Sequence, residues 1–154
     1  MLFDSRSELA CAKLLELCVK DWEPIDGKTV HIPIGFKRSV DFRVGNYLIE
    51  FHPIRVFREW ADGANTKQLM VALSKCSKSD RASALDAISK ELAITYAKKR
   101  RFCMDFSSDE DVRNSKLLVA TNSYEFCDKV LPVVATNWLP NRTILISQFY
   151  KWRK

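Results

Sequence analysis

The sequence predicts an α/β fold in which a mixed β-sheet is flanked by helices. Two observations carry this prediction. Amphipathic helical segments alternate with short β-branched runs, and one apolar run has the character of a strand buried on both faces. A chain of 154 residues with 47% hydrophobic and 29% charged residues is typical of a globular protein with its own core. We therefore expect a single domain over residues 1–154.

The first predicted element is a helix over about Arg6–Lys20. Ser5 and Glu8 have the S-x-x-E spacing of a capping box, in which the serine hydroxyl accepts a hydrogen bond at the start of a helix. Apolar residues then recur at helical spacing, at Cys11, Leu14, Leu15 and Cys18.

Three short segments of strand character follow, at 29–34, 38–44 and 47–51. Pro33 limits the first of them to an edge position or a short pairing, because proline has no N–H to donate. Gly45-Asn46 separates the second from the third, and these residue types suit a two-residue hairpin turn with positive φ.

The second half of the chain predicts two helices, at 66–75 and 83–101, before the buried strand Lys116–Thr121. The longer helix carries one apolar stripe, made of Leu85, Ile88, Leu92 and Tyr96. A further helix over 123–131 is expected to stop at Pro132. The chain ends in RTILISQFYKWRK, whose β-branched and aromatic residues predict a strand with a basic tail.

Charge and cysteine content narrow the class of protein. The 25 lysines and arginines exceed the 19 acidic residues and give a net charge of +6, which permits a nucleic-acid partner, although many basic domains bind none. The five cysteines lack zinc-site spacing and are expected to be small buried residues in a reducing compartment. Charges interrupt the first residues, and no run of about 18 apolar residues occurs. We therefore expect no membrane partner and a cytoplasmic, nucleoid-associated location.

The predicted hairpin carries two acids and a histidine. With Gly45-Asn46 as its loop, the directly paired residues are Val44–Tyr47, Arg43–Leu48, Phe42–Ile49, Asp41–Glu50, Val40–Phe51 and Ser39–His52. One face is then wholly apolar, with Val40 and Phe42 on it. The other face places Asp41 opposite Glu50, with Cβ atoms about 4.5 to 5.5 Å apart, and like charges so placed destabilise a sheet unless a cation lies between them.

Two interpretations of this acidic pair remain open. A divalent cation such as Mg²⁺ takes one or two carboxylates together with water and phosphate oxygens, and would remove the repulsion. Alternatively, Arg43 on the same strand face neutralises the pair. A third acid, Glu8, heads the apolar stripe of the first helix, so it can point toward the sheet as well as cap the helix.

A helix with a glutamate, a hairpin with the spacing D-x8-E-x-H and a helix ending in basic residues together resemble the PD-(D/E)XK nuclease superfamily, over about Ser5–Thr121. Restriction endonucleases, Holliday-junction resolvases, mismatch-repair nicking enzymes and some homing endonucleases share its αβββαβ core. The resemblance implies an Mg²⁺- or Mn²⁺-dependent endonuclease that hydrolyses phosphodiester bonds of double-stranded DNA, of site-specific homing or restriction type. It also implies a homodimer or a higher symmetric homo-oligomer.

By this resemblance Asp41 and Glu50 match the two metal-binding acids, and Glu8 matches the glutamate often found on the first helix. His52 stands where the family usually has the lysine that orients or activates the attacking water. A neutral imidazole can act as a general base near its ordinary pKa of about 6.5 or as a metal ligand. It is equally a polar residue at a strand end, so a catalytically inactive nuclease-fold protein that binds DNA or serves in assembly remains the alternative.

Basic residues around these acids are candidate phosphate contacts: Lys37, Arg38, Arg55, Arg58, Lys98, Lys99, Arg100 and Arg101. The last four close a predicted helix. Because the helix dipole favours cations at that position anyway, a solvated helix end is the simpler explanation for them.

Overall fold

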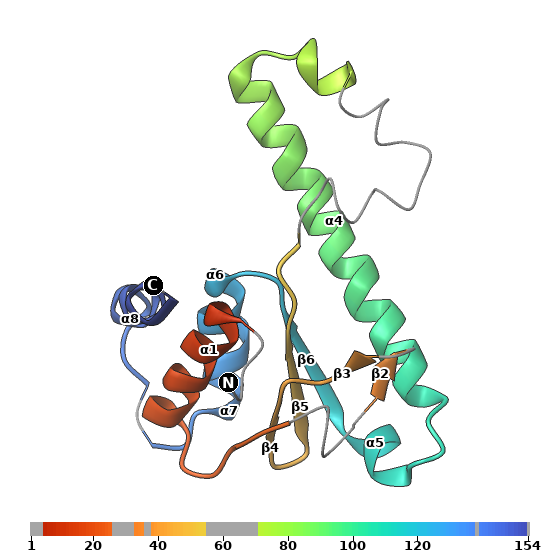
Figure 1. Cartoon of the computed structure of the whole chain (residues 1–154), viewed down its shortest axis with the longest axis vertical. Helices are drawn as coiled ribbons and strands as arrows, with labels where there is room; N and C mark the ends of the chain where they lie inside the picture. Colours follow the sequence, from red (N-terminus) through yellow and green to blue (C-terminus); the bar gives the residue numbers. More distant parts are fainter. Residues whose placement is uncertain (1–4, 26–32, 36–37, 55–70, 138, 154) are drawn as a thin grey trace. The chain divides into compact units, whose positions relative to one another are not determined.

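The computed structural model of the chain (Figure 1) describes residues 5–25, 33–35, 38–54, 71–137 and 139–153. The chain divides into two compact units. The sheet unit comprises Met1–Pro53 with Lys99–Lys154, and the helical unit comprises Ile54–Lys98.

A mixed β-sheet forms the centre of the sheet unit. Among the described residues its four strands lie in the order β1 (Glu23–Pro24), β4 (Phe42–Val44), β5 (Tyr47–Phe51) and β6 (Lys116–Ala120). The pairs β1–β4 and β4–β5 are antiparallel, whereas β5 and β6 are parallel. The predicted α/β class with a mixed sheet is therefore confirmed. The sequence patterns did not indicate β1.

The β4–β5 hairpin has the turn and, next to it, the register that the sequence predicts. Gly45 adopts a φ of +58°, a left-handed conformation that glycine reaches without steric cost. The pairs that form the ladder are Val44–Tyr47, Arg43–Leu48 and Phe42–Ile49.

Beyond Phe42 the predicted register is wrong, because the chain forms a β-bulge at Asp41. The backbone N–H of Asp41 donates to the carbonyl of Ile49 (3.1 Å), which is already the partner of Phe42, so that two residues oppose one. In the described ladder, therefore, Asp41 does not pair with Glu50, nor Val40 with Phe51, nor Ser39 with His52.

The bulge also moves Val40 to the other side of the sheet. Val40 packs with Leu48, whereas Phe42 belongs to the opposite core, so the prediction that Val40 and Phe42 share one apolar face is wrong. The predicted strand 38–44 is two strands, since β3 (Arg38–Ser39) pairs with β2 (Pro33–Gly35) in a separate two-stranded sheet. Residues 29–32 of the first predicted strand lie outside the described residues.

Helices cover one face of the sheet (Figure 1). They are α1 (Arg6–Cys18), the continuous segment α6 (Ser123–Glu125), η1 (Phe126–Val130) and α7 (Leu131–Val134), and α8 (Arg142–Arg153). The N-terminal cap of α1 is confirmed, because the Ser5 hydroxyl accepts the N–H of Glu8 at 3.1 Å. Three of the cysteines, Cys11, Cys18 and Cys127, are buried in this core as expected.

The helix predicted to stop at Pro132 instead continues to Val134. Its middle turn is π-helical, with the N–H of Leu131 donating to the carbonyl of Phe126 five residues earlier. In a regular α-helix the ring of Pro132 would clash with the carbonyl of Asp128. Proline also has no N–H that could donate to that carbonyl. The wider turn ahead of the proline accommodates the ring, which is why the helix does not end there.

The C-terminal segment predicted as a strand is the helix α8. Asn141 caps it, since its side-chain oxygen accepts the N–H of Ile144 at 3.0 Å. Leu145 and Phe149, one turn apart, are both buried in the core that α1 also lines. The β-branched and aromatic composition is a weak preference, and the burial of this helical stripe outweighs it.

The opposite face of the sheet is covered by α5 (Glu110–Asn114) and by the last turn of α4 (Lys78–Asp105), which lies in the sheet unit. Val40, Leu48, Met104 and Val112 form this second core, with Ile25 and Leu117 packed against it. Leu117 packs here and Leu118 against the first core, so β6 has apolar contacts on both faces. The predicted full burial is not reached, because β6 is an edge strand and only Ala120 of its residues is buried.

The helical unit contains the first part of α4, which extends beyond the predicted 83–101 at both ends. Residues 71–74 are helical, and the start of the predicted helix 66–75 lies outside the described residues. Arg81 donates from Nε to the carbonyl of Leu73 at 3.0 Å and joins the two helical segments. Of the described helices, none combines the length and the apolar composition needed to cross a membrane.

Packing of α8 on the core gives a stability prediction. Phe149 is 1% exposed and its ring lies 5.8 Å from that of Phe51. We expect Phe149→Ala to lower the free energy of unfolding by about 3 to 5 kcal/mol, the usual cost of removing a buried ring. Ile144→Ala, on the exposed side of the same helix, should cost less than about 1 kcal/mol. Urea denaturation measures both, and equal small losses would contradict the packing.

Candidate functional site

The predicted site lies at the carboxyl end of the parallel pair β5–β6. The pairing continues one residue past β5, because the N–H of His52 donates to the carbonyl of Ala120 at 2.9 Å. In Figure 1 the N-terminal end of α1 lies at this same end of the sheet. Ligands of open α/β sheets commonly bind outside the carboxyl ends of parallel strands.

Asp41 is held at the bulge by its backbone and by its side chain. Its carbonyl accepts the N–H of Ile25 at 2.8 Å. Its carboxylate oxygen Oδ2 accepts the N–H of Phe51 at 2.8 Å. The carboxylate therefore contacts the backbone of the residue that follows Glu50, even though the predicted Asp41–Glu50 pair does not form.

Glu50 is nearly inaccessible, with 5% of its surface exposed. Because side chains alternate along a strand, Glu50 and His52 lie on the same side of β5 as Leu48, and His52 is half-buried. Burying an ionised carboxylate costs free energy unless charges or hydrogen bonds compensate for its lost water. Buried ionisable side chains occur preferentially at functional sites.

The carboxylates of Glu8 and Asp41 both affect the pKa of a buried cysteine of α1, Cys11. Complete burial raises the pKa of Cys11 well above its usual range, and the Asp41 and Glu8 carboxylates raise it further because their negative charges disfavour a thiolate. The two carboxylates therefore lie near the same side chain. Glu8 is half-buried in the first turn of α1.

The alternative in which Arg43 neutralises Asp41 and Glu50 is wrong. The Arg43 guanidinium forms an ion pair with Asp111 (2.8 Å) and donates from Nε to the carbonyl of Gly45 (3.1 Å). It thereby joins the hairpin turn to α5.

Sequence reasoning missed a polar network directly after β6. The side chain of Glu125 accepts hydrogen bonds from the hydroxyl and the backbone N–H of Thr121, and it forms an ion pair with Lys129 (3.1 Å). Asn122 caps α6 by accepting the N–H of Glu125 at 2.8 Å. The N-x-x-E spacing of Asn122 and Glu125 is a capping signature that would have indicated a helix start here.

The predicted phosphate contacts have different surroundings. Lys98 and Lys99 are exposed, and Arg100 is half-buried. Arg101 donates to the carbonyls of Ser115 (2.6 Å) and Arg113 (2.9 Å) and pairs with Asp105, so it joins α4 to the segment before β6. Arg38 begins β3, whereas Lys37, Arg55 and Arg58 lie outside the described residues.

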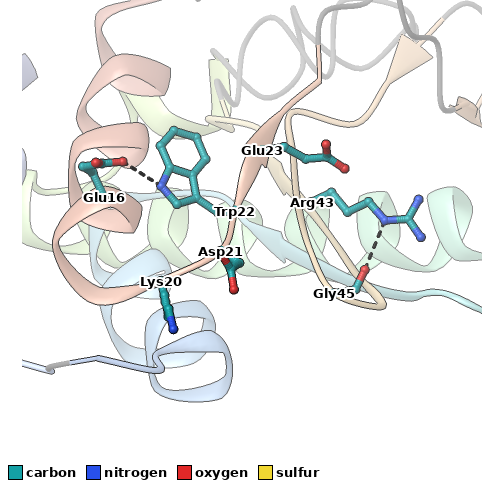
Figure 2. A pocket seen from close by; sticks show the side chains of 7 residues that line it. All are labelled: Glu16, Lys20, Asp21, Trp22, Glu23, Arg43 and Gly45. Carbon is teal, nitrogen blue, oxygen red and sulfur yellow. Dashed lines mark hydrogen bonds between the residues drawn. The ribbon is translucent and has the colours of Figure 1, made fainter.

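A pocket of about 460 Å³ lies elsewhere on the sheet unit, between the end of α1, β1 and the hairpin turn (Figure 2). Trp22 donates from its indole nitrogen to Glu16 at 2.9 Å on one side of it, and Arg43 borders the other side. None of the four predicted site residues Glu8, Asp41, Glu50 and His52 lines this pocket.

The donor atoms at the β5 end suit a hard cation. Within the described residues, no group of three or more His, Cys, Asp and Glu side chains is arranged to hold a metal ion. Mg²⁺ binds proteins through one or two carboxylates and completes its shell with water and phosphate oxygens. Asp41 and Glu50 fit such a two-carboxylate site by donor type.

The hydrogen bond from the Phe51 N–H to the Asp41 carboxylate gives a stability prediction. It distinguishes the contribution of this hydrogen bond from that of the Asp41 charge. Asp41→Ala leaves the N–H of Phe51 without its acceptor and should lower the free energy of unfolding by about 1 to 3 kcal/mol. Asp41→Asn keeps an acceptor oxygen and should retain most of that stability. Thermal and urea denaturation of both variants without divalent ions test this, and equal losses would show that the charge, and not the hydrogen bond, stabilises the bulge.

Glu125 gives a pH-dependent prediction. Partial burial raises the pKa of this carboxyl, but hydrogen bonds from Thr121 and the charge of Lys129 outweigh burial and leave the pKa below its ordinary value. A lowered pKa in the folded state stabilises the protein above the unfolded pKa of about 4.3, and the stability is lost as pH falls through the folded value.

Glu125→Gln should therefore lower the free energy of unfolding at pH 7 by about 1 kcal/mol. The difference from wild type should shrink as pH falls through the lowered pKa of the folded state, because the wild-type carboxyl is then also protonated. Urea denaturation across this range measures it, and a difference that does not change with pH would assign the loss to packing.

No protein-family model matches the chain, and no match was found among curated proteins or solved structures. The likeness of the hairpin to PD-(D/E)XK nucleases therefore stays a prediction based on its residues.

Proposed function

We propose that this chain is a metal-dependent DNA endonuclease with a restriction-endonuclease-like αβββαβ core. The observation that carries the proposal is the pair of acids at the end of β5. The carboxylate of Asp41, at the bulge, is bound to the backbone beside the buried Glu50.

The order of elements supports the proposal. A helix, α1, precedes three antiparallel strands of the main sheet, β1, β4 and β5, and the long helix α4 then leads to β6, which is parallel to β5. An αβββαβ core would have this order, with β2, β3 and α5 as additions to it. Fold alone does not give function, so the argument rests on the acids.

Asp41 and Glu50 would hold Mg²⁺ or Mn²⁺, with Glu8 assisting directly or through water. A divalent ion there would supply a Lewis acid that polarises a phosphoryl oxygen and activates water. The hydrogen bond from Phe51 fixes one oxygen of Asp41, so the protein orients this ligand before DNA arrives.

His52 lies on the same side of β5 as Glu50, two residues further along the strand. Its imidazole would orient or deprotonate the attacking water, a role in which the family usually has lysine. Its backbone N–H is bonded to Ala120, so the position of the residue is fixed by the sheet.

Double-stranded DNA is the proposed substrate, and a site-specific enzyme of homing or restriction type is the proposed kind. The net charge of +6 favours association with a polyanion. Because one active site cuts one strand, a homodimer or a higher symmetric homo-oligomer would provide the second cut.

A nicking assay on supercoiled plasmid tests the proposal. Wild-type protein should nick the plasmid with Mg²⁺ or Mn²⁺ and not with EDTA. Glu50→Gln should abolish nicking, because it removes a ligand charge with almost no change in shape, whereas Glu91→Gln on the exposed surface of α4 should be fully active. His52→Ala should lower the rate by about 10² to 10⁴ fold.

His52→Lys restores the family's usual residue. Activity in that variant would show that the position of residue 52, and not the imidazole itself, is what the attacking water requires. Nicking that persists in EDTA or in Glu50→Gln would overturn the site. DNA binding without nicking, in wild type and with either metal, would favour a catalytically inactive nuclease-fold protein.

A further inference from the structure

An open groove of about 380 Å³ lies between α1 and α8, which pack against each other in the sheet unit (Figure 1). Its apolar lining includes Leu17 of α1 together with Ile144 and Trp152 of α8. These three residues are 38%, 42% and 41% exposed. We call this feature the α1–α8 groove, and its polar lining consists of Lys13, Glu16 and Gln148.

Contacts near both ends of α8 hold this helix against α1. The segment that leads into α8 is bound to the end of α1, because the carbonyl of Cys18 accepts the N–H groups of Thr136 (3.0 Å) and Asn137 (3.1 Å). Near the other end of α8, the ammonium of Lys13 lies 4.9 Å from the ring centroid of Trp152. Both walls of the groove are therefore positioned before any partner binds.

The helix α8 has two apolar stripes. Leu145 and Phe149, one turn apart, are buried in the core. Ile144 and Trp152, two turns apart, lie on a neighbouring stripe and are exposed in the groove, next to Leu17 of α1. Exposed apolar side chains that gather in one place, and aromatic ones especially, are typical of surfaces that contact another protein.

The charged side chains that line the groove in the described structure are of opposite sign. Lys13 and Glu16 lie three residues apart on α1, so they are neighbours on one face of the helix. The carboxylate of Glu16 is held there by the indole N–H of Trp22, which donates to its Oε2 at 2.9 Å.

This order of charges is complementary to itself. A two-fold axis that crosses α1 between Lys13 and Glu16 reverses the direction of the helix in a second copy. Lys13 then faces the partner's Glu16, and Glu16 faces the partner's Lys13. Contacts of this kind, in which the same patch is used by both subunits, are the commonest in symmetric oligomers, and complementary charges fix their register.

We propose that the α1–α8 groove is the contact surface of a homodimer, in which a second copy of the chain binds around this two-fold axis. Leu17, Ile144 and Trp152 leave water in the contact, and the two symmetry-related ion pairs lie at its rim. The proposed endonuclease requires a second active site. The inference therefore rests on the proposed function for the expectation of a second copy, and on the groove for the place where that copy binds.

A membrane surface fits the groove less well. A helix that binds in the plane of a membrane inserts a continuous apolar face and carries cations beside it. Here the carboxylate of Glu16 and the amide of Gln148 lie among the apolar side chains, and an anionic lipid surface repels the carboxylate.

Sedimentation velocity in EDTA and without DNA tests the proposal apart from hydrolysis. We expect the wild-type chain to form a dimer that dissociates on dilution through the micromolar range. Leu17→Glu and Ile144→Glu should each raise the dimer Kd about tenfold or more, because each places a charge in the apolar part of the contact. Ile94→Glu is the matched control, since Ile94 is 58% exposed on α4, and it should leave the Kd unchanged.

A charge exchange tests the two-fold axis itself. Lys13→Glu and Glu16→Lys each bring like charges together across the axis and should raise the dimer Kd about tenfold. An equal mixture of the two variants should recover dimers, because the acidic helix of one then meets the basic helix of the other. Changes within a single chain cannot produce recovery on mixing. Lys90→Glu and Asp86→Lys, from an exposed ion pair of α4, are the matched controls and should dimerise like wild type, alone and mixed.

The proposal is overturned if the wild-type chain stays monomeric throughout the micromolar range, or if a dimer forms that neither Leu17→Glu nor Ile144→Glu weakens. It is also overturned if mixing the two charge variants recovers no dimer. A monomer whose binding to phosphatidylserine vesicles is lost in Trp152→Ala would assign the groove to a membrane instead. Circular dichroism of each variant checks that α1 and α8 are retained.

The plasmid assay distinguishes failure of this proposal from failure of the proposed function. A dimer with the expected response to the variants that does not nick DNA would contradict the endonuclease and support the groove. Metal-dependent nicking by a protein that is monomeric in sedimentation would support the endonuclease and overturn the groove.

Discussion

Pairing of β5 along both of its edges is the constraint on which the rest of the sheet unit depends. The strand is antiparallel to β4 on one edge and parallel to β6 on the other, so it joins a local hairpin to a strand more than sixty residues later in the chain. Its side chains alternate between two cores, with Ile49 and Phe51 in one and Leu48 in the other. Because the side-chain period is two, a slip of one residue would exchange the two sets, and the burial of both faces fixes a single register.

The hairpin was predictable because its signals are local. The Gly45-Asn46 turn and the apolar alternation on either side of it determine the first three pairs. The bulge at Asp41 was not predictable in this way, since it adds one residue to a strand whose composition is unchanged. The helix α8 was missed for another reason: its β-branched residues suggest a strand, and only the burial of Leu145 and Phe149 against a distant part of the chain selects a helix. The candidate acids were therefore identified from the sequence, but their arrangement was not.

Departures from regular structure gather at the carboxyl end of β5 and β6. They are the bulge at Asp41, the buried carboxylate of Glu50, and the π-helical turn η1, which begins six residues after β6 ends. Proteins usually follow the local rules of propensity, pairing and burial together, and places where several rules are broken at once are commonly functional. The remainder of the sheet unit has ordinary apolar cores. This contrast is a physical reason, independent of family resemblance, to look for chemistry at this end of the sheet.

Burial also divides the cysteines into two chemical classes. Burial raises the pKa of Cys11 and of Cys18, and it raises that of Cys127 to about 12, so that these thiols remain protonated at neutral pH. Oxidants attack the thiolate and need access to it, and the half-buried Cys76 and Cys103 are the more accessible pair. Oxidative damage to this protein would therefore begin outside the core that contains α1, Cys11, Cys18 and Cys127. The first products would be chains modified or cross-linked at their periphery, with the sheet and its candidate site still folded.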